Sequence, residues 1–321
     1  MLRCHSLPRG LYAPAMDPTY AVRHRHYDAW SARSARPRTA LSEYADVLLV
    51  SISDAQRKPL PWANWRGTVY HGLPGDLYRF HPEPSGYLAF FGRLCPEKRV
   101  DRAIAIAQRA GIELKIAAKV DAADDEYFET EIRHLLDDPL VDFIGEIGDG
   151  EMEAFLGRAA ALLMPIDWPE PFGLVVIGAM ACGTPVIAFP FGSMPELIEP
   201  GVNGALVENV DEAVAAVEAL AALDRTLCRR SFEERFTTCR MARNYVGVYE
   251  ALVEEARSSF DGAAPAWYRS PVSSSCAGRD RGAAASRSAR RNRRRRTNAM
   301  IVEASVLDHP RGARELARSL G

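Results

Sequence analysis

The 321-residue sequence lacks several patterns that would assign it to a class at once. It has no run of about 18 apolar residues, so no membrane-spanning helix is predicted. Its first twenty residues contain no apolar core of signal-peptide length, and we therefore expect a cytoplasmic protein. The six cysteines show no C-x-x-C spacing, which argues against structural zinc and for reduced thiols. No predicted strand is followed by G-x-G-x-x-G, which disfavours a hydride-transferring dehydrogenase.

The net charge of −2 conceals an uneven distribution of charge. Residues 279–296 contain nine arginines and one aspartate, a local charge of +8, which leaves −10 for the rest of the chain. An acidic body is a poor surface for nucleic acid, so no nucleic-acid partner is expected. The arginines belong to a basic, low-complexity segment, 259–321, that we expect to be disordered.

Apolar patterning divides the remainder into two regions. Residues 1–85 are interpreted as a partial N-terminal domain, in which 1–40 lack apolar periodicity and are expected to be poorly ordered, while strands are predicted at 46–53 and 67–72. Between 86 and 258, apolar runs alternate with helical patterns, which predicts βα units in one complete, doubly wound parallel sheet. The expected fold class is therefore α/β. The predicted strands of this region are 87–93, 114–119, 141–146, 160–166, 184–189 and 204–207. The predicted helices are 97–110, 125–136, 150–158, 171–182, 194–199, 211–222 and a long amphipathic segment, 229–258.

Ligands of doubly wound sheets bind at the carboxyl ends of strands, and two strand ends in the first half of this region carry suitable residues. In "FFGRLCPEKRVD", Gly92 permits a sharp turn after the strand, Arg93 follows at once, and Lys98 lies at the mouth of the next helix. Two cations beside open helix N–H groups would form an anion site, although a solvated charged loop has the same composition. In "DFIGEIGDGE" a strand ends at Gly145, and the backbone groups of residues 144–147, beginning with Ile144, could meet a nucleobase, with an ordinary turn as the alternative.

A third strand end lies in the stretch "DWPEPFGLVVIGAMACGTPVIAF". Pro171 suits a first helical position, so a helix is predicted over 171–182 with Glu170 at its entrance. The open end of this helix would consist of the N–H groups of Phe172, Gly173 and Leu174. These groups suit an anion, whereas Glu170 suits sugar hydroxyls beside it, unless it is simply a helix-capping carboxylate. Together the three strand ends describe a site for a diphosphate that joins a sugar to a nucleoside.

Three segments, "GRLCPEKRVDRAI", "EPFGLVVIGAMACGTPVIA" and "GSMPELIEPGVNG", resemble the signatures of the retaining glycosyltransferases of family 4, which have the GT-B fold. The resemblance covers about residues 46–258. It implies two Rossmann-like domains, of which 86–258 would be the domain that binds the nucleotide sugar. It also implies transfer of a hexose from a nucleotide-diphosphate sugar to a saccharide, lipid or small-molecule acceptor, with retention of configuration and without a metal ion or other cofactor.

The resemblance further implies roles for single residues. Arg93 and Lys98 match the cations that bind the donor phosphates. Glu170 matches the first carboxylate of an E-x7-E motif, which contacts the transferred sugar, and it is the expected catalytic residue. Gly173 and Leu174 match the backbone donors to the diphosphate, whose departure would be stabilised electrostatically by these groups.

The sequence departs from the family pattern in two places. The second carboxylate of E-x7-E, which holds the ribose hydroxyls in the family, falls at Gly178, on about the same side of a regular helix as Glu170. Glycine cannot make that contact, and in mid-helix it costs about 1 kcal/mol relative to alanine. In the family, the first domain contributes a glycine-rich loop for the acceptor and a histidine near the reacting sugar. Residues 1–45 contain no counterpart of either. A donor-binding remnant with weak or no turnover is therefore the alternative function, while "EPFGL" and "PEKR" disfavour a sugar-nucleotide epimerase.

Overall fold

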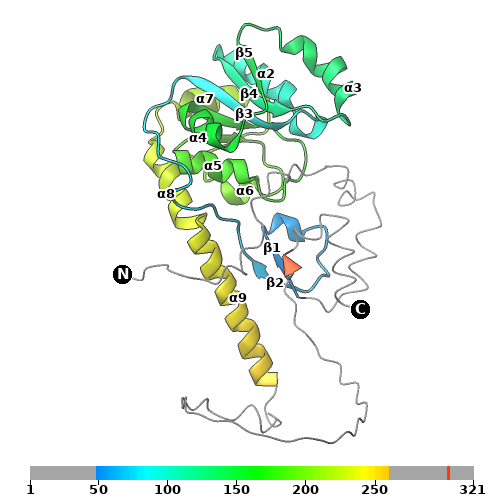
Figure 1. Ribbon diagram of the computed structural model, residues 1–321, viewed down its shortest axis with the longest axis vertical. Coiled ribbons are helices and arrows are strands. Elements are labelled where there is room, and N and C mark those ends of the chain that lie inside the picture. The colour runs from blue at the N-terminus through cyan, green and yellow to red at the C-terminus, as the bar shows by residue number, and fades with distance from the viewer. Residues whose placement is uncertain (1–47, 260–301, 304–321) are drawn as a thin grey trace, which may run out of the picture. The chain divides into compact units, whose positions relative to one another are not determined.

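A computed structural model describes residues 48–259 and 302–303 of the chain (Figure 1). All of them lie in one of the two units into which the chain divides, Val47–Glu303. They form one parallel sheet of six strands and another of three. The predictions made for 1–40 and for the arginine-rich segment 279–296 fall outside the described residues.

The larger sheet contains the six strands predicted between residues 86 and 258. They are β3 (Tyr87–Arg93), β4 (Leu114–Lys119), β5 (Val141–Gly145), β6 (Ala159–Met164), β7 (Val186–Ala188) and β8 (Gly204–Leu206). Every neighbouring pair is parallel, in the order β5-β4-β3-β6-β7-β8. In chain order these are the third, second, first, fourth, fifth and sixth strands, which is the arrangement of a doubly wound nucleotide-binding sheet. The predicted α/β class is confirmed.

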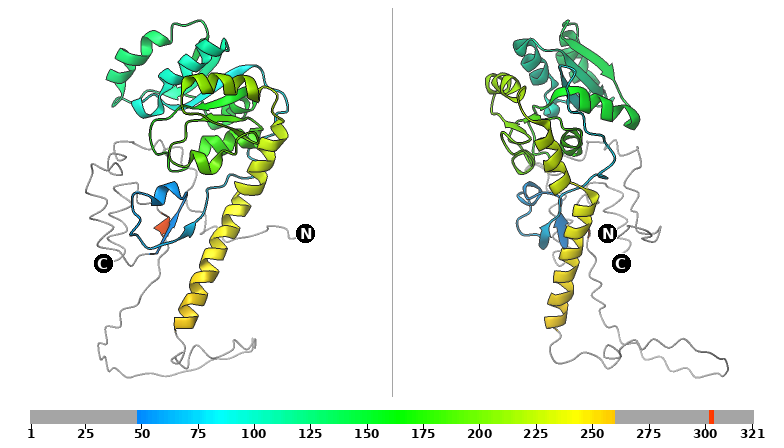
Figure 2. Two further views of the ribbon diagram at one scale, coloured as in Figure 1. Left: turned by 180° about the vertical axis from the view of Figure 1, so that it is seen from behind. Right: turned by 90° about the vertical axis from the view of Figure 1, so that its left-hand side faces the viewer.

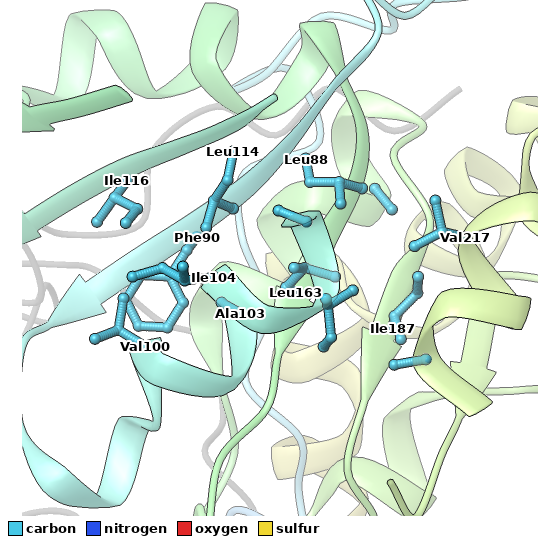
Figure 3. Packing of buried hydrophobic residues seen from close by; sticks show 14 of the residues in the cluster. Leu88, Phe90, Val100, Ala103, Ile104, Leu114, Ile116, Leu163, Ile187 and Val217 are labelled. Carbon is cyan, nitrogen blue, oxygen red and sulfur yellow. The ribbon is translucent and has the colours of Figure 1, made fainter. Parts of the chain in front are cut away.

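Helices cover this sheet because its central strands are apolar on both faces (Figures 1 and 2). One helical layer consists of α2 (Val100–Ala110) and α7 (Val210–Leu220), and another of α4 (Asp149–Arg158), α5 (Leu174–Cys182) and α8 (Arg225–Arg235). In α2, buried residues recur with helical spacing at Val100, Ala103, Ile104 and Ala107. Figure 3 shows this stripe packed on the strands, where the buried cluster includes Leu88, Phe90, Leu114, Ile116, Leu163, Ile187 and Val217.

Two predicted helices are irregular or divided. The segment predicted at 125–136 consists of α3 (Asp125–Tyr127), a π-helical turn (Phe128–Ile132) and a 3-10 turn (Arg133–Leu135). The prediction of one helix over 229–258 is wrong, because α8 ends before Phe236 and α9 (Thr238–Ser259) begins after it. In Figure 2, α9 is the long yellow helix. The Phe236 side chain is fully buried, and its carbonyl accepts a hydrogen bond from the N–H of Leu73 at 2.9 Å. This insertion into the core separates the two helices.

The smaller sheet consists of β1 (Leu49–Ser51), β2 (Trp65–Thr68) and β9 (Val302–Glu303), in the order β2-β1-β9. The last strand falls within the segment predicted to be disordered. A 3-10 turn, η2 (Ala55–Arg57), follows β1, and the Ser53 hydroxyl accepts from the Gln56 N–H at 3.1 Å. Lys58 follows the turn and precedes Pro59, and it keeps helical backbone angles, with φ −53° and ψ −44°.

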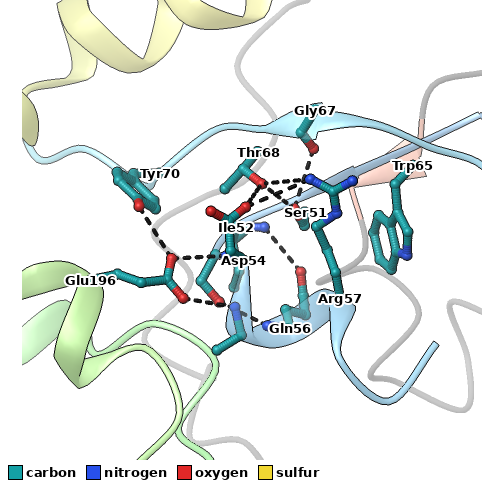
Figure 4. Close-up of polar contacts among 12 residues, drawn as sticks. Ser51, Ile52, Asp54, Gln56, Arg57, Trp65, Gly67, Thr68, Tyr70 and Glu196 are labelled. Carbon is teal, nitrogen blue, oxygen red and sulfur yellow. Dashed lines mark hydrogen bonds and ion pairs between the residues drawn. The ribbon is translucent and has the colours of Figure 1, made fainter. Parts of the chain in front are cut away.

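Glu196 joins the residues before β3 to the helices of the larger sheet (Figure 4). It belongs to α6 (Met194–Leu197), within the third family-like segment. Its carboxylate accepts from the N–H groups of Asp54 at 2.8 Å and Ala55 at 2.7 Å, and from the Tyr70 hydroxyl at 3.1 Å. Burial, reinforced by the charge of Glu196, raises the pKa of Tyr70 to about 12, so the hydroxyl stays a neutral donor.

Candidate donor site

The strand order reverses between β3 and β6, and ligands of doubly wound sheets bind outside the carboxyl ends of such strands. The loop after β3 carries Arg93 and Lys98, and the loop after β6 carries Glu170. The Asp167 N–H donates to the Glu97 carbonyl at 2.9 Å, so the two loops are in direct contact. The topology therefore brings two of the three family-like segments to one place.

Lys98 and Glu170 form an ion pair across these two loops. The Lys98 Nζ lies 2.5 Å from a Glu170 carboxylate oxygen, and the two side chains are only 16% and 14% exposed. The same Nζ lies 5.1 Å from the centre of the Trp168 ring, an additional cation–π contact. A cation and a carboxylate are thus held together at the switch point, where they could serve two chemically different parts of one ligand.

Arg93 is surrounded by three carboxylates. Its guanidinium nitrogens lie 2.9 Å from Glu97, 3.4 Å from Asp124 and 3.6 Å from Asp121, and its side chain is 14% exposed. Burial raises the pKa of Asp124 above its usual range, although the positive charge of Arg93 opposes this. These carboxylates would compete with a phosphate for the Arg93 guanidinium. The sequence did not reveal this enclosure, because Asp121 and Asp124 belong to the loop after β4.

Arg99 ties the same loops together at the start of α2. Its φ of 53° is the only left-handed value of a non-glycine residue within 48–259 and 302–303. The guanidinium lies 2.8 Å from Asp101 and 3.1 Å from Asp167, so it links the start of the helix to the loop after β6. These contacts compensate for a backbone conformation that costs a non-glycine residue about 1–2 kcal/mol.

The helix predicted at 171–182 is wrong at its start, since α5 begins at Leu174. Gly173 precedes it with a left-handed φ of 94°, a conformation that favours glycine. The Phe172 side chain is buried, with the His71 ring 5.1 Å and the Phe236 ring 6.2 Å away. The burial of this ring determines the path of the chain before the helix. Phe172, Gly173 and Leu174 nevertheless lie at the N-terminal end of α5, as the predicted diphosphate site requires.

The loop after β7 supports Glu170 from behind, a role that the sequence did not reveal. The Ser193 N–H donates to the Glu170 carbonyl at 2.8 Å. Gly192 is left-handed, with a φ of 61°, and a side chain there would collide with the backbone of Glu170. The signal was present in the segment "GSMPELIEPGVNG", which begins at this glycine. That segment therefore contains both the residues that hold the backbone of Glu170 and Glu196, whose carboxylate tethers residues 54–55 to α6.

Gly178 is buried within α5 and faces Tyr78. A Cβ atom on Gly178 would lie 3.3 Å from Cε2 of Tyr78 and 3.5 Å from the Leu156 side chain. Burial raises the pKa of Tyr78 to about 12, so its hydroxyl is neutral. Glu170 lies four residues before the start of α5, so the expectation that it shares a side of the helix with position 178 stays a prediction. The aromatic ring occupies space next to the glycine.

The predicted nucleobase residues lie two strands away from Arg93. Ile144 and Gly145 end β5, and Ile144 is 40% exposed. Between β5 and β3 lies β4, whose last residue, Lys119, is 46% exposed and lies 3.5 Å from Asp121. Sequence reasoning did not single out Lys119. The nucleobase role of Ile144 and Gly145 stays a prediction.

The described residues also set limits on other chemistry. Over 48–259 and 302–303, no group of three or more His, Cys, Asp or Glu side chains is arranged to hold a metal ion. Within the same residues, no helix is long and apolar enough to cross a membrane. The absence of a metal requirement stays a prediction.

Comparison with known proteins identifies the region that contains this site. Residues 79–234 match the sequence model of the family described as glycosyl transferases group 1. The D-inositol 3-phosphate glycosyltransferase of Mycolicibacterium smegmatis is 32% identical over 147 residues, which cover 45% of this chain and 34% of that protein. The GDP-mannose-dependent alpha-(1-6)-phosphatidylinositol dimannoside mannosyltransferase of Mycobacterium tuberculosis is 26% identical over 266 residues, 74% of this chain and 69% of that protein.

Solved structures show the same fold. AviGT4, a glycosyltransferase involved in Avilamycin A biosynthesis, aligns with a TM-score of 0.55 at 26% identity, over 64% of this chain and 63% of that one. Anabaena Alr3699/HepE, in complex with UDP and glucose, aligns with a TM-score of 0.57 at 19% identity, over 67% and 66%. The chain covers about a third of the length of the first curated relatives. Residues 79–234 are therefore similar in sequence to the glycosyl transferases group 1, and the described residues have an α/β fold of GT-B type.

Proposed function

We propose that this chain is a family 4-like retaining glycosyltransferase, which transfers a hexose from a nucleotide-diphosphate sugar to an acceptor. The observation that supports this most strongly is the 2.5 Å contact of Lys98 with Glu170 at the switch point of the sheet. The pair lies within the matched residues 79–234, and a protein of similar fold is known in complex with UDP and glucose. A cytoplasmic location and independence of metal ions belong to the proposal.

The ion pair separates when the donor binds. Lys98 exchanges the Glu170 carboxylate for an oxygen of the diphosphate, which also approaches the N–H groups of Phe172, Gly173 and Leu174. Glu170 then accepts hydrogen bonds from hydroxyls of the sugar. Both exchanges replace one charge-assisted contact by another, so neither side chain is left buried without a partner.

The transfer itself breaks the bond between the anomeric carbon and the diphosphate oxygen, and the electron pair leaves with the diphosphate. The acceptor oxygen forms the new bond on the face that the diphosphate vacates, which retains the configuration. The acceptor proton passes to the departing diphosphate. Lys98 and the N-terminal end of α5 stabilise the negative charge that develops there.

A donor-binding protein with little or no turnover is the second candidate. The observation that favours it is Gly178, which packs against Tyr78 where the resembled family has its ribose carboxylate. Before β3, the described residues form β1, η2 and β2, and an acceptor-binding domain is not among them. Without a second substrate held beside the anomeric carbon, the proximity contribution to the rate is lost.

Calorimetric titration with UDP, GDP and ADP, and then with their glucose and mannose forms, tests the proposal. We expect one nucleotide to bind, and Lys98→Ala to weaken its binding by about 1.5–3 kcal/mol, or roughly 10- to 150-fold. Lys58→Ala is the matched control, because Lys58 is an exposed lysine of the loop after η2. Unchanged affinity in Lys98→Ala, with an unchanged melting temperature, would remove Lys98 from the site.

Glu170→Gln separates the two roles of the pair. We expect it to keep or improve the affinity for the nucleoside diphosphate, because Lys98 loses its competing carboxylate. It should lose the additional affinity that wild type has for the nucleotide sugar over the nucleoside diphosphate. A subsequent assay of nucleoside-diphosphate release with candidate acceptors distinguishes the transferase from the binding protein.

A further inference from the structure

Lys119 is a cation at the carboxyl edge of the sheet to which the proposed mechanism gives no role. It is the last residue of β4, and the strand register pairs it with Arg93, the last residue of β3. The Leu94 N–H donates to the Lys119 carbonyl at 2.9 Å, so the two strands remain paired to their ends. Because β4 lies between β5 and β3, Lys119 stands between the predicted nucleobase residues and the predicted diphosphate residues.

Lys119 is much more accessible than Arg93. Its side chain is 46% exposed, against 14% for Arg93. The Lys119 Nζ lies 3.5 Å from Asp121, a weak and partly exposed ion pair, whereas Arg93 is held by three carboxylates. Lys119 can turn towards a ligand at little cost, but moving Arg93 would leave half-buried carboxylates without their cation.

Asp121 connects the two cations. It lies 3.5 Å from the Lys119 Nζ and 3.6 Å from a guanidinium nitrogen of Arg93. The three groups therefore form one chain of charges along the ends of β3 and β4, with the accessible cation on the side of β5. An anion that replaced Asp121 beside Lys119 would leave Arg93 with Glu97 and Asp124.

From this arrangement we propose that Lys119 binds the phosphate next to the nucleoside in the donor. The assignment rests on the proposed function, since it concerns one phosphate of the same nucleotide diphosphate. Phosphate is the group that a flexible, partly exposed ammonium binds by charge-assisted hydrogen bonds. The place of β4 in the sheet selects the phosphate nearest the base, while Lys98 contacts Glu170, the residue expected to bind the sugar.

The experiment compares a nucleoside, its monophosphate and its diphosphate by calorimetry in a low-salt buffer without phosphate, with the base that wild type binds best. Lys119→Ala is expected to weaken binding of the monophosphate and of the diphosphate by the same factor, about tenfold or more, and to leave the affinity for the nucleoside unchanged. Lys119→Arg should retain most of the affinity. Lys98→Ala, by contrast, should weaken binding of the diphosphate more than binding of the monophosphate.

Two further variants control for charge alone. Lys115→Ala removes the same charge from the same face of β4, four residues before Lys119, and should leave all three affinities unchanged. Asp121→Asn should tighten monophosphate binding by roughly two- to fivefold, the worth of a partly exposed ion pair.

The outcomes separate this inference from the proposed function. Equal monophosphate affinities of wild type and Lys119→Ala overturn the role of Lys119. The role is also overturned if Lys119→Ala loses as much affinity for the nucleoside as for the two nucleotides, because the side chain would then act on the base or on the fold. If folded wild type binds none of the three ligands, the proposed function fails as well.

Discussion

Replacing Gly178 tests how α5 is packed. An alanine there improves helix propensity by about 1 kcal/mol. Its Cβ would lie 3.3 Å from Cε2 of Tyr78, a close contact that requires the half-buried ring to move slightly. We therefore expect Gly178→Ala to raise the free energy of unfolding, by less than the full 1 kcal/mol.

A glutamate at position 178 is expected to lower the free energy of unfolding relative to alanine. Its stem would point towards Tyr78 and Leu156, and a carboxylate without hydrogen-bond partners in a buried place costs about 1–3 kcal/mol or more. Gly178→Glu should therefore be less stable than Gly178→Ala by about that amount. It should not tighten nucleotide binding while the Tyr78 ring remains in place.

Urea denaturation of both variants, repeated in a Tyr78→Ala background, measures the contact as a double-mutant cycle. The cost of the glutamate should fall once the ring is removed, and any gain in affinity for a ribonucleotide over its 2′,3′-dideoxy analogue should appear only then. If Gly178→Glu stabilises the wild-type background as much as Gly178→Ala does, the side chain does not meet Tyr78 and the reasoning is refuted.

Three further predictions concern stability, measured by urea denaturation. Glu196→Ala should cost about 1.5–3 kcal/mol because two N–H groups and one hydroxyl lose their acceptor, and an unchanged value would show that the tether is dispensable. Arg99→Gly should be more stable than Arg99→Ala by about 1 kcal/mol, since both lose the same ion pairs but only glycine accepts the left-handed backbone; equal stabilities would argue against strain. Arg225→Met should cost about 3 kcal/mol or more, because the buried guanidinium donates to three backbone carbonyls, whereas exposed Arg230→Met should stay within about 0.5 kcal/mol. Similar losses of stability in the two arginine variants would show that the hydrogen bonds of Arg225 to the three carbonyls do not stabilise the fold.

The larger sheet could be predicted from the sequence because its strands are continuous apolar runs, separated by helices with a clear helical period. The placement of Lys98 and Glu170 in neighbouring loops also followed, since the carboxyl ends of parallel strands share one edge. The start of α5 could not be predicted, because proline at 171 suits a helix while the burial of Phe172 and the turn at Gly173 depend on tertiary contacts.

Contacts between distant segments were beyond the sequence pattern. Nothing in the composition of the loop after β4 indicates that Asp121 and Asp124 enclose Arg93. Tyr78, the neighbour of Gly178, likewise comes from a loop that precedes β3, and the sequence around the glycine does not indicate this contact. Such pairings depend on how loops pack, which local periodicity does not specify.

A crystal structure with the nucleotide sugar that binds most tightly in calorimetry tests the central claim most directly. The account predicts that the 2.5 Å contact between Lys98 and Glu170 is broken in that complex. The Lys98 Nζ should then lie within hydrogen-bond distance of a diphosphate oxygen, and the Glu170 carboxylate within that distance of a sugar hydroxyl. An intact Lys98–Glu170 pair, with the nucleotide sugar bound elsewhere on the chain, would contradict it.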